Sequence, residues 1–431
     1  GLLLSDTEKA AVAEFLTGVK VGNATLPDSA FTKFNIKSAA PLITDHSGWG
    51  NDLAATGYRS AKQSGITPAN VTSLKLKWAF ALPYQSIMRA KPAIIDQWLI
   101  FGTQFGDVYA LDRNTGKIGW HFAAGSSVRG AITVIRSGSK ITAYFADFST
   151  NTYAVDVKTG KMIWSKRAGF ESLSGVTGSV AVHDGRVYVP ITSQEVSQAT
   201  SGTYECCTTS GGLVALDAKT GERVWTHRVI AEKAVVAGTK KNGKPFYGPS
   251  GAPVWSSPTI DAKRGLVYIG TGENYSNPST SSSDAIQAID MKTGKLVWNF
   301  QGTSDDAYNS ACPVFVNCPE KAGPDLDFGM SPMLVKTEAG KELLVAGQKS
   351  GVVHAISPDD GKMVWQTRIG KGGMLGGIHW GMASDNKYVF ACNSDNTTAI
   401  DKRDTSVKAS PGLYALDIST GKIAWQNNPE P

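Results

Sequence analysis

Six segments of the chain share one pattern of apolar and polar positions. Each has a short apolar run, an Asp or Ser, a turn of two or three residues, a Gly, a charged residue and a Trp. The six are YALDRNTGKIGW (109–120), YAVDVKTGKMIW (153–164), VALDAKTGERVW (214–225), QAIDMKTGKLVW (287–298), HAISPDDGKMVW (354–365) and YALDISTGKIAW (414–425). The pattern predicts a strand, a tight turn and a second strand in every repeat. Because one small sheet cannot bury its own faces, the sequence predicts an all-β fold, a β-propeller with tryptophan-docking repeats.

The N-terminal part of the chain lacks this pattern. Residues 1–22 predict a short helix in which Ser5 is the N-cap and Glu8 completes a capping box. An irregular lead-in follows over 33–70. The segment SLKLKWAFALP (73–83) then has the character of a strand, with Trp78 placed like the last Trp of a repeat. We expect this strand to close the ring as the outermost strand of the last blade.

The C-terminal end raises a question about the number of blades. Only six residues follow Trp425, too few for a further blade. Either the closing strand joins a partner within six blades, or about two more blades lie beyond residue 431. The second alternative is favoured because the closing strand otherwise has no blade to complete. We therefore expect residues 23–431 to form an eight-bladed propeller domain of which about six blades and the closing strand are present.

Composition excludes some classes of function. The formal charge of +6 is spread along the chain without basic blocks, which argues against nucleic-acid binding. No run of about 18 apolar residues occurs, so no membrane span is expected. The cysteines form two close pairs, Cys206 with Cys207 and Cys312 with Cys318, which indicates an oxidising compartment such as the periplasm. The alternative is that all five cysteines are reduced.

The repeats themselves are structural. In the motif Asp-x-x-Thr-Gly-Lys, the Asp and Thr side chains bond turn backbone groups, and the Trp packs between neighbouring blades. We therefore assign no catalytic role to the repeat aspartates, which are Asp112, Asp156, Asp217, Asp290 and Asp417.

With the residues between the repeats, the chain resembles the pyrroloquinoline-quinone (PQQ)-dependent alcohol dehydrogenases over about residues 45–431. The runs ECCTTSGGLVALDAKTG (205–221), GTGENYS (270–276) and DLDFGMSPML (325–334) are most similar to the polyvinyl-alcohol dehydrogenase-like soluble quinoproteins. The repeat alone resembles equally a cofactor-free propeller that acts as a scaffold in outer-membrane protein assembly. The polar residues on the inner strands separate the two.

The resemblance implies a site for the planar, tricarboxylated quinone PQQ. Matching the family's strands suggests Arg129 for a cofactor carboxylate, Thr177 as a hydroxyl donor and Trp255 as the floor under the quinone, although Trp255 alternatively wedges between blades. The remaining expected cofactor contacts are Trp380 at the channel rim, Asn393 as an amide and the Cys206–Cys207 pair as a roof over the quinone.

The same resemblance implies Ca²⁺ and a catalytic base. The expected calcium ligands are Glu195 and Asn274, with Glu273 as the alternative to Asn274 by one residue; Lys349 is expected beside the quinone oxygens. Hard oxygen ligands of this kind suit Ca²⁺. For the base, Asp327 leads and Asp306 is the alternative. In the family's "H-D" and "W-D" motifs, this sequence has Asp305 in place of His and Leu326 in place of Trp. The choice between Asp327 and Asp306 as the catalytic base therefore stays open.

Together these expectations describe an oxidoreductase. The resemblance implies PQQ- and calcium-dependent oxidation of primary or secondary alcohols, including polyols, sugars or polyvinyl alcohol, to carbonyls. Electrons would pass to a cytochrome c or another acceptor. The helix at 4–18 either resembles the last helix of a class I cytochrome c domain, as the remnant of a fused domain, or is a simple cap. The rival function is the cofactor-free scaffold, which would not need the four residues Glu195, Asn274, Asp327 and Lys349 together.

Overall fold

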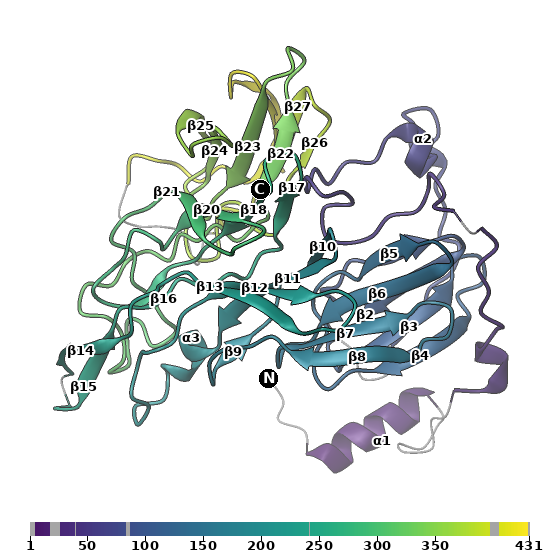
Figure 1. The fold of residues 1–431 in the computed structure, drawn as a ribbon, viewed down its shortest axis with the longest axis horizontal. Helices are drawn as coiled ribbons and strands as arrows, with labels where there is room; N and C mark the ends of the chain where they lie inside the picture. Colours follow the sequence, from purple (N-terminus) through teal and green to yellow (C-terminus); the bar gives the residue numbers. More distant parts are fainter. Residues whose placement is uncertain are drawn as a thin grey trace.

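In the described part of the chain, six antiparallel sheets of four or five strands follow one another (Figure 1). The computed structural model describes residues 5–17, 26–38, 40–82, 87–240, 242–396 and 405–429. Five sheets have four strands each, paired in sequence order, and one has a fifth short strand, β9, beside β11. The all-β propeller architecture predicted from the repeats is confirmed. The prediction of eight blades stays a prediction.

The sheets, which we call blades 1 to 6 in chain order, have the following bounds. Blade 1 contains β1 (Ala93–Ile95), β2 (Trp98–Gly102), β3 (Asp107–Asp112) and β4 (Ile118–Ala123). Blade 2 contains β5 (Thr133–Ser137), β6 (Lys140–Ala146), β7 (Asn151–Asp156) and β8 (Met162–Arg167). Blade 3 contains β9 (Ser174–Gly175), β10 (Ala181–His183), β11 (Arg186–Ser193), β12 (Gly212–Asp217) and β13 (Arg223–Arg228).

Blade 4 contains β17 (Thr259–Asp261), β18 (Leu266–Gly270), β20 (Ala285–Asp290) and β21 (Leu296–Gln301). Blade 5 contains β22 (Met333–Lys336), β23 (Glu342–Gly347), β24 (Val352–Ile356) and β25 (Met363–Arg368). Blade 6 contains β26 (Ala383–Ser384), β27 (Tyr388–Asn393), β28 (Gly412–Asp417) and β29 (Ile423–Asn427). Two small pairs stand outside the blades, β14 (Val235–Thr239) with β15 (Pro245–Gly248) and β16 (Ser250–Gly251) with β19 (Asn274–Ser276).

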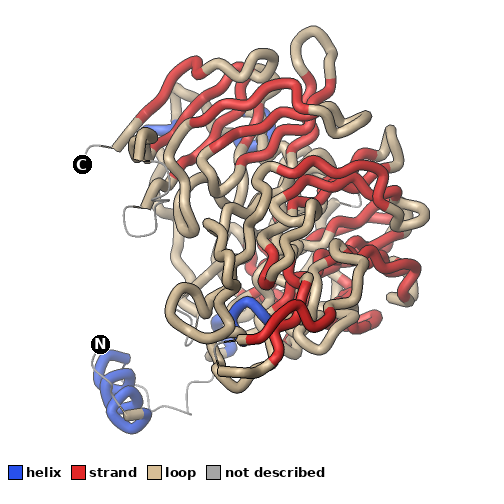
Figure 2. The backbone as a smooth tube through the Cα atoms, turned by 90° about the vertical axis from the view of Figure 1, so that its left-hand side faces the viewer, coloured by secondary structure: helices blue, strands red, loops and turns tan. Residues whose placement is uncertain are grey.

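Helical elements are few and short. They are α1 (Asp6–Thr17), α2 (Ala61–Ser64), α3 (Glu195–Gln198) and the 3₁₀ turns η1 (Asp28–Ala30) and η2 (Val71–Ser73). The predicted capping box at the start of α1 is confirmed, because Ser5 N–H donates to Glu8 Oε2 and Glu8 N–H donates to Ser5 Oγ. Figure 2 shows α1 outside the body formed by the sheets. No helix among the described residues is long and apolar enough to cross a membrane.

The hydrophobic core is divided into layers between neighbouring blades. Each layer buries apolar residues from two consecutive blades, so five layers join the six blades. The repeat tryptophans fasten these layers, because each indole N–H donates to the carbonyl that follows the repeat Asp or Ser of the next blade. These bonds run from Trp120 to Val157, Trp164 to Ala218, Trp225 to Met291, Trp298 to Pro358 and Trp365 to Ile418, at 2.9–3.1 Å. The structure therefore confirms the predicted structural role of the repeat.

Trp78 takes the same position on blade 1. Its indole N–H donates to Arg113 O at 2.9 Å, and Trp78, Phe80 and Leu82 pack on the outer face of blade 1. The prediction that this segment is a strand was wrong for residues 74–82, where no strand is present; residues 83–86 lie outside the described part. A strand needs a neighbour to pair with, and the described chain offers none at this place. The docking of Trp78 does not need one.

The lead-in crosses the inner ends of the blades. His46 pairs with Ile94 of β1, and Gly48 N–H donates to Ile132 O just before β5. Further on, the carbonyls of Leu53, Ala54 and Thr56 accept bonds from Ile260 of β17, Leu334 of β22 and Ser384 of β26. Residues 46–56, which the sequence indicated only as an irregular segment, therefore bind the innermost strands of blades 1, 2, 4, 5 and 6.

Candidate active site

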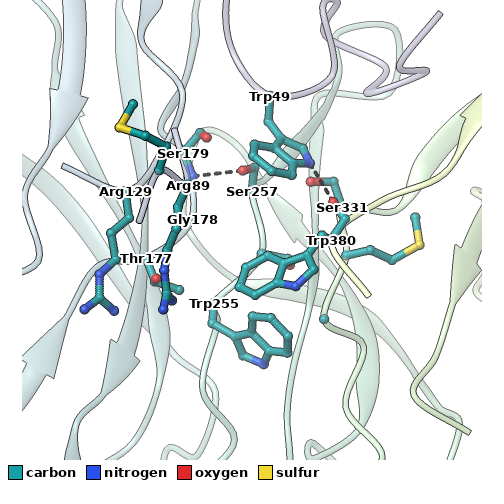
Figure 3. Close-up of a pocket in the computed structure, with 14 residues that line it drawn as sticks. Trp49, Arg89, Arg129, Thr177, Gly178, Ser179, Trp255, Ser257, Ser331 and Trp380 are labelled. Atoms are coloured by element: carbon teal, nitrogen blue, oxygen red, sulfur yellow. Dashed lines mark hydrogen bonds between the residues drawn. The ribbon is translucent and has the colours of Figure 1, made fainter. Parts of the chain in front are cut away.

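One pocket lies where the inner ends of the blades meet the lead-in (Figure 3). Its volume is about 430 Å³, and its walls come from segments that are far apart in the sequence. The lining residues are Trp49 from the lead-in, Met88 and Arg89 from the segment just before β1, Arg129, Thr177–Ser179, Trp255–Ser257, Gly329–Ser331 and Trp380. Trp49 is fixed in the wall because its indole N–H donates to Trp380 O at 2.9 Å. The pocket thus combines two guanidinium groups, three indoles and several hydroxyls.

Trp255 is the buried aromatic surface of this pocket. Its ring lies against Gly329, where an added Cβ would come within 2.2 Å of the indole, so only glycine fits. Trp380 meets Trp255 edge-on, with ring centroids 5.0 Å apart. The indole N–H of Trp255 donates to Asp327 Oδ2 at 2.9 Å. Trp255 therefore connects the pocket to a group of carboxylates on its other side.

That group consists of Glu273, Asp325 and Asp327, which we call the acidic cluster. All three are buried, and one ligand oxygen from each lies within 4.8 Å of the others. Lys349 enters the cluster, with its Nζ 2.6 Å from Asp325 Oδ1 and 3.0 Å from Asp327 Oδ2. The same Nζ lies 5.5 Å from the centre of the Trp255 ring. One ammonium group therefore faces three carboxyls and one indole.

Burial and mutual repulsion separate the pKa values of these groups. Burial, followed by the charges of Asp327 and Asp325, raises the pKa of Glu273 well above its usual range. Burial also raises the pKa of Asp325 to about 7, although the Lys349 charge acts against it. For Asp327 burial is opposed by Lys349 and by hydrogen bonds from Glu273, so its pKa is lowered. Burial opposes the charged form of Lys349, but the charges of Asp327 and Asp325 outweigh it and raise the Lys349 pKa.

Local backbone structure places the two aspartates. Asp306, the alternative base, is buried, and its carboxylate accepts bonds from the N–H groups of Asp325 at 3.0 Å and Leu326 at 2.8 Å. Asp325 is held in a left-handed backbone conformation with φ 61°. Non-glycine residues rarely adopt this conformation, and where they do the surroundings hold them there. Asp306 therefore positions the segment that carries the cluster.

Four of the predicted cofactor residues lie together in the pocket, namely Arg129, Thr177, Trp255 and Trp380. The Arg129 guanidinium lies 4.0 Å above the Phe148 ring. Asn393 is buried but does not line the pocket, and its amide donates to Ser410 O at 2.7 Å. The Cys206–Cys207 disulfide is also elsewhere. It is buried against Tyr275 and Ala311, and the second predicted pair, Cys312–Cys318, packs beside it.

The predicted calcium ligands Glu195 and Asn274 are occupied by bonds within the protein. The Glu195 carboxylate is buried and accepts four bonds, from Tyr204 OH, Thr208 N–H, Thr209 N–H and Thr209 Oγ1. The Asn274 Oδ1 accepts from Thr280 N–H at 2.7 Å. Glu195 is not one of the three carboxyls of the acidic cluster, whereas Glu273, the alternative to Asn274, is one of them.

Sequence reasoning missed three residues of the site. Asp325 was passed over because Asp327, two residues later, was matched to the family's base; the Asp-x-Asp spacing was the available signal. Trp49 lies in the lead-in and Arg89 in the segment just before β1, and both were missed because neither segment has a repeating pattern. Only the folded chain brings these two to the pocket.

A further buried carboxyl belongs to Asp284, the residue directly before β20. It is fully buried, and neither of its oxygens has a hydrogen-bond partner among the described residues. Burial, followed by the charge of Asp306, raises the pKa of Asp284 well above its usual range. Its φ of 48° is left-handed. This carboxyl therefore favours its protonated form.

A comparison with family models decides the family. The model described as "Glucose/ethanol/alcohol dehydrogenase, beta-propeller domain", which is named for PQQ, matches residues 47–325. The chain belongs to this family. In this PQQ-family propeller, the match covers part of the pocket and of the cluster, namely Arg129, Thr177, Trp255, Glu273 and Asp325, and it ends before Asp327 and Trp380. A second model, described as outer membrane protein assembly factor BamB, matches residues 349–430.

Individual relatives of this PQQ-family propeller include two named polyvinylalcohol dehydrogenase. The protein from Pseudomonas sp. is 37% identical over 383 residues, which cover 88% of this chain and 58% of the relative. The protein from Sphingopyxis sp. (strain 113P3) is 35% identical over 403 residues, covering 90% and 60%. The chain thus spans about three fifths of the length of these relatives. A solved structure, the quinohemoprotein alcohol dehydrogenase from Comamonas testosteroni, has the same fold, with a TM-score of 0.66, 20% identity and coverage of 91% of this chain and 68% of that one.

The residues present fit the groups that the family implies. A planar tricarboxylated quinone needs cations for its carboxylates and flat apolar surfaces, and the pocket offers Arg129, Arg89 and the Trp255 indole. A divalent cation needs hard oxygen donors, and the acidic cluster offers three buried carboxyls, two of which also contact Lys349 Nζ. Glu273, Asp325 and Asp327 are therefore the residues that could hold Ca²⁺.

Proposed function

We propose that the protein oxidises alcohols to carbonyl compounds with PQQ bound in the pocket and Ca²⁺ held by the acidic cluster. The observation that carries this proposal is the hydrogen bond from Trp255 to Asp327, which joins a cationic, aromatic pocket to three buried carboxyls. When bound, the quinone supplies the acceptor for the hydride of the alcohol carbon.

The pocket residues bind and orient the cofactor. Arg129, held over Phe148, offers its guanidinium to a carboxylate, and Thr177 offers a hydroxyl. Trp255 offers a flat surface. Lys349 is kept charged by Asp325 and Asp327, so it can stabilise negative charge that develops beside the Trp255 ring.

The base that takes the hydroxyl proton is one of the two cluster aspartates. Asp327 is already engaged, because Oδ1 accepts from Glu273 N–H at 3.0 Å and Oδ2 accepts from Trp255 and lies beside Lys349. Asp325 contacts Lys349 through one oxygen, Oδ1, and takes no part in the hydrogen bond that holds Trp255. We therefore assign proton abstraction to Asp325 and orientation of Trp255 and Lys349 to Asp327.

The substrate and the electron acceptor are proposed from the relatives. Two relatives named polyvinylalcohol dehydrogenase support a secondary alcohol or a polymer of secondary alcohols as substrate. A cytochrome c is proposed as acceptor. Two disulfide bonds support the periplasm as the compartment, because such bonds persist in oxidising surroundings.

Reconstitution tests the proposed function. The purified protein is incubated with PQQ and Ca²⁺, and reduction of an artificial dye is followed with 2-propanol, 2,4-pentanediol, ethanol and polyvinyl alcohol. Activity is expected only when quinone, cation and alcohol are all present. Quinone binding without turnover of any of these alcohols would contradict the proposed reaction. Failure to bind quinone at all would favour the scaffold function suggested by the second family model.

The variants Asp325→Asn and Asp327→Asn distinguish the two candidate bases. For Asp325→Asn we expect kcat to fall by about 10²–10⁴-fold with quinone affinity within about threefold of the parent protein. For Asp327→Asn both quinone affinity and kcat are expected to fall, because Trp255 and Lys349 lose their common partner. If Asp327→Asn lowers kcat alone while Asp325→Asn leaves it unchanged, Asp327 is the base.

A further inference from the structure

Two arginines on one wall of the pocket have no acidic partner among the described residues. Arg89 and Arg129 both line the cavity, and Figure 3 shows their side chains running in the same direction along one wall. Within the described part of the chain, neither makes an ion pair with a carboxylate. None of the described residues that line the pocket is acidic. The acidic cluster lies beyond Trp255 and is already paired with Lys349.

The two guanidinium groups line the same cavity, and the charge of Arg89 acts on Arg129. Burial, and after it the charge of Arg89, lowers the pKa of Arg129. Arg129 cannot turn away freely, because its guanidinium lies 4.0 Å above Phe148 and its Nε donates to Ser127 Oγ at 3.3 Å. Like charges that converge without a counter-ion are unfavourable. A ligand with carboxylates at this wall would remove the repulsion and gain charge-assisted hydrogen bonds.

Arg89 reaches the pocket from a segment that the lead-in holds in place. Lys91, two residues later, donates from Nζ to Trp49 O at 2.8 Å and to Asn51 Oδ1 at 2.6 Å. Trp49 in turn donates to Trp380 O in the opposite wall. The short segment 87–91 and the crossing segment 46–56 are therefore one unit, which brings Arg89 and Trp49 to the same cavity. Arg89 itself is exposed, so it lies at the solvent-exposed edge of the pocket.

We propose that Arg89 is a binding residue of the pocket, and that Arg89 and Arg129 together select a planar ligand carrying at least two carboxylates. This inference rests on the proposed function, in which PQQ is that ligand. It adds a contact from outside the blades, so segment 87–91 contributes directly to cofactor selection. A planar quinone without carboxylates gains nothing from Arg89.

Equilibrium dialysis with two probes tests this proposal. One probe is PQQ, and the other is 1,10-phenanthroline-5,6-dione, a planar ortho-quinone that has no carboxylate. The variants are Arg89→Ala, Arg89→Lys and Arg129→Ala, with Arg167→Ala as the matched control, because Arg167 is an exposed arginine of β8 that does not line the pocket. Circular dichroism and thermal unfolding of each variant without ligand check the fold.

For PQQ we expect Arg89→Ala and Arg129→Ala each to raise Kd by about tenfold or more, Arg89→Lys to raise it less, and Arg167→Ala to leave it within about twofold. For the dione we expect Arg89→Ala to leave Kd within about twofold. An unchanged PQQ affinity in Arg89→Ala would overturn the inference while leaving the proposed function intact. Equal losses for both probes would overturn it too, since Arg89 would then act through pocket shape. A parent protein that does not bind PQQ would overturn the proposed function itself.

Discussion

The indole N–H of Trp255 donates to Oδ2 of Asp327 at 2.9 Å. This bond links the floor of the aromatic pocket to a carboxylate whose other oxygen accepts from Glu273 N–H. Gly272 permits the approach, because an added Cβ there would lie 2.9 Å from the Asp327 carboxylate. The position of the ring and the position of the carboxylate are therefore fixed together.

The first prediction distinguishes the contribution of the Trp255 ring from that of its N–H group. Trp255→Phe keeps an aromatic surface but removes the bond to Asp327. We expect PQQ affinity within about threefold of the parent protein and a fall in kcat of about tenfold, the effect of losing one hydrogen bond to a charged group. Trp255→Ala should instead lose most quinone affinity. Dialysis and dye-reduction kinetics measure both; equal affinities in the Phe and Ala variants would show that the ring does not contact the quinone.

The second prediction concerns Glu195, which the resemblance indicates as a calcium ligand. Glu195→Gln replaces an acceptor oxygen by a donor amide in front of Tyr204, Thr208 and Thr209. We expect the free energy of unfolding to fall by about 2–4 kcal/mol, because several charge-assisted hydrogen bonds are lost. Chemical denaturation measures this value.

Calcium titration of Glu195→Gln and Glu273→Gln then decides the ligand question. The acidic cluster predicts an affinity loss of about tenfold or more for Glu273→Gln and a much smaller change for Glu195→Gln. The opposite order would restore Glu195 as a ligand and exclude Glu273.

The third prediction follows from the buried, unpaired carboxyl of Asp284. Because burial raises its pKa, the folded protein keeps a proton that the unfolded chain releases above about pH 4. The stability contributed by this proton is fully present below about pH 4 and is lost as the pH rises. Asp284→Asn, which also suits a left-handed backbone, should therefore be more stable than the parent at pH 7 and similar to it at pH 4.

Thermal unfolding at both pH values measures the difference. We expect a midpoint higher by about 2–4 °C at pH 7, the change that about 1 kcal/mol produces in a domain of a few hundred residues. A variant that is equally or less stable at pH 7 would indicate that Asp284 is ionised and stabilised by a partner.

The fourth prediction compares two repeat tryptophans. Trp164 is buried, with 8% of its surface exposed, and donates to Ala218 O, whereas Trp425 is 43% exposed. Trp164→Ala should lower the free energy of unfolding by about 3–5 kcal/mol. Trp425→Ala serves as the matched control and should cost less than about 1 kcal/mol. A comparable loss of unfolding free energy in both variants would mean that the Trp425 side chain is buried in the folded protein.

The repeats determined the scaffold because their pattern is local. An Asp, a Thr and a Gly at fixed spacing define the turn, and the Trp that follows reaches the equivalent turn of the next blade, so blades 1 to 6 and the docking of Trp78 were predictable. The strand expected around Trp78 was not formed, because pairing depends on a neighbouring strand rather than on the segment itself. The roles of Arg129, Thr177 and Lys349 remain predictions, but the fold places all three beside Trp255 or in the pocket that it lines.

Tertiary structure alone decided which acidic residues meet. Glu273 and Asn274 are adjacent in sequence, and only the fold shows that Glu273 joins the cluster while Asn274 bonds Thr280. Trp49 and Arg89 carry no repeating signal, because both lie before the first repeat, and only the folded chain brings them to the pocket. The sequence by itself determined the repeating sheets and the kinds of chemistry available. The tertiary structure decided which side chains share the site, because that depends on contacts between segments hundreds of residues apart.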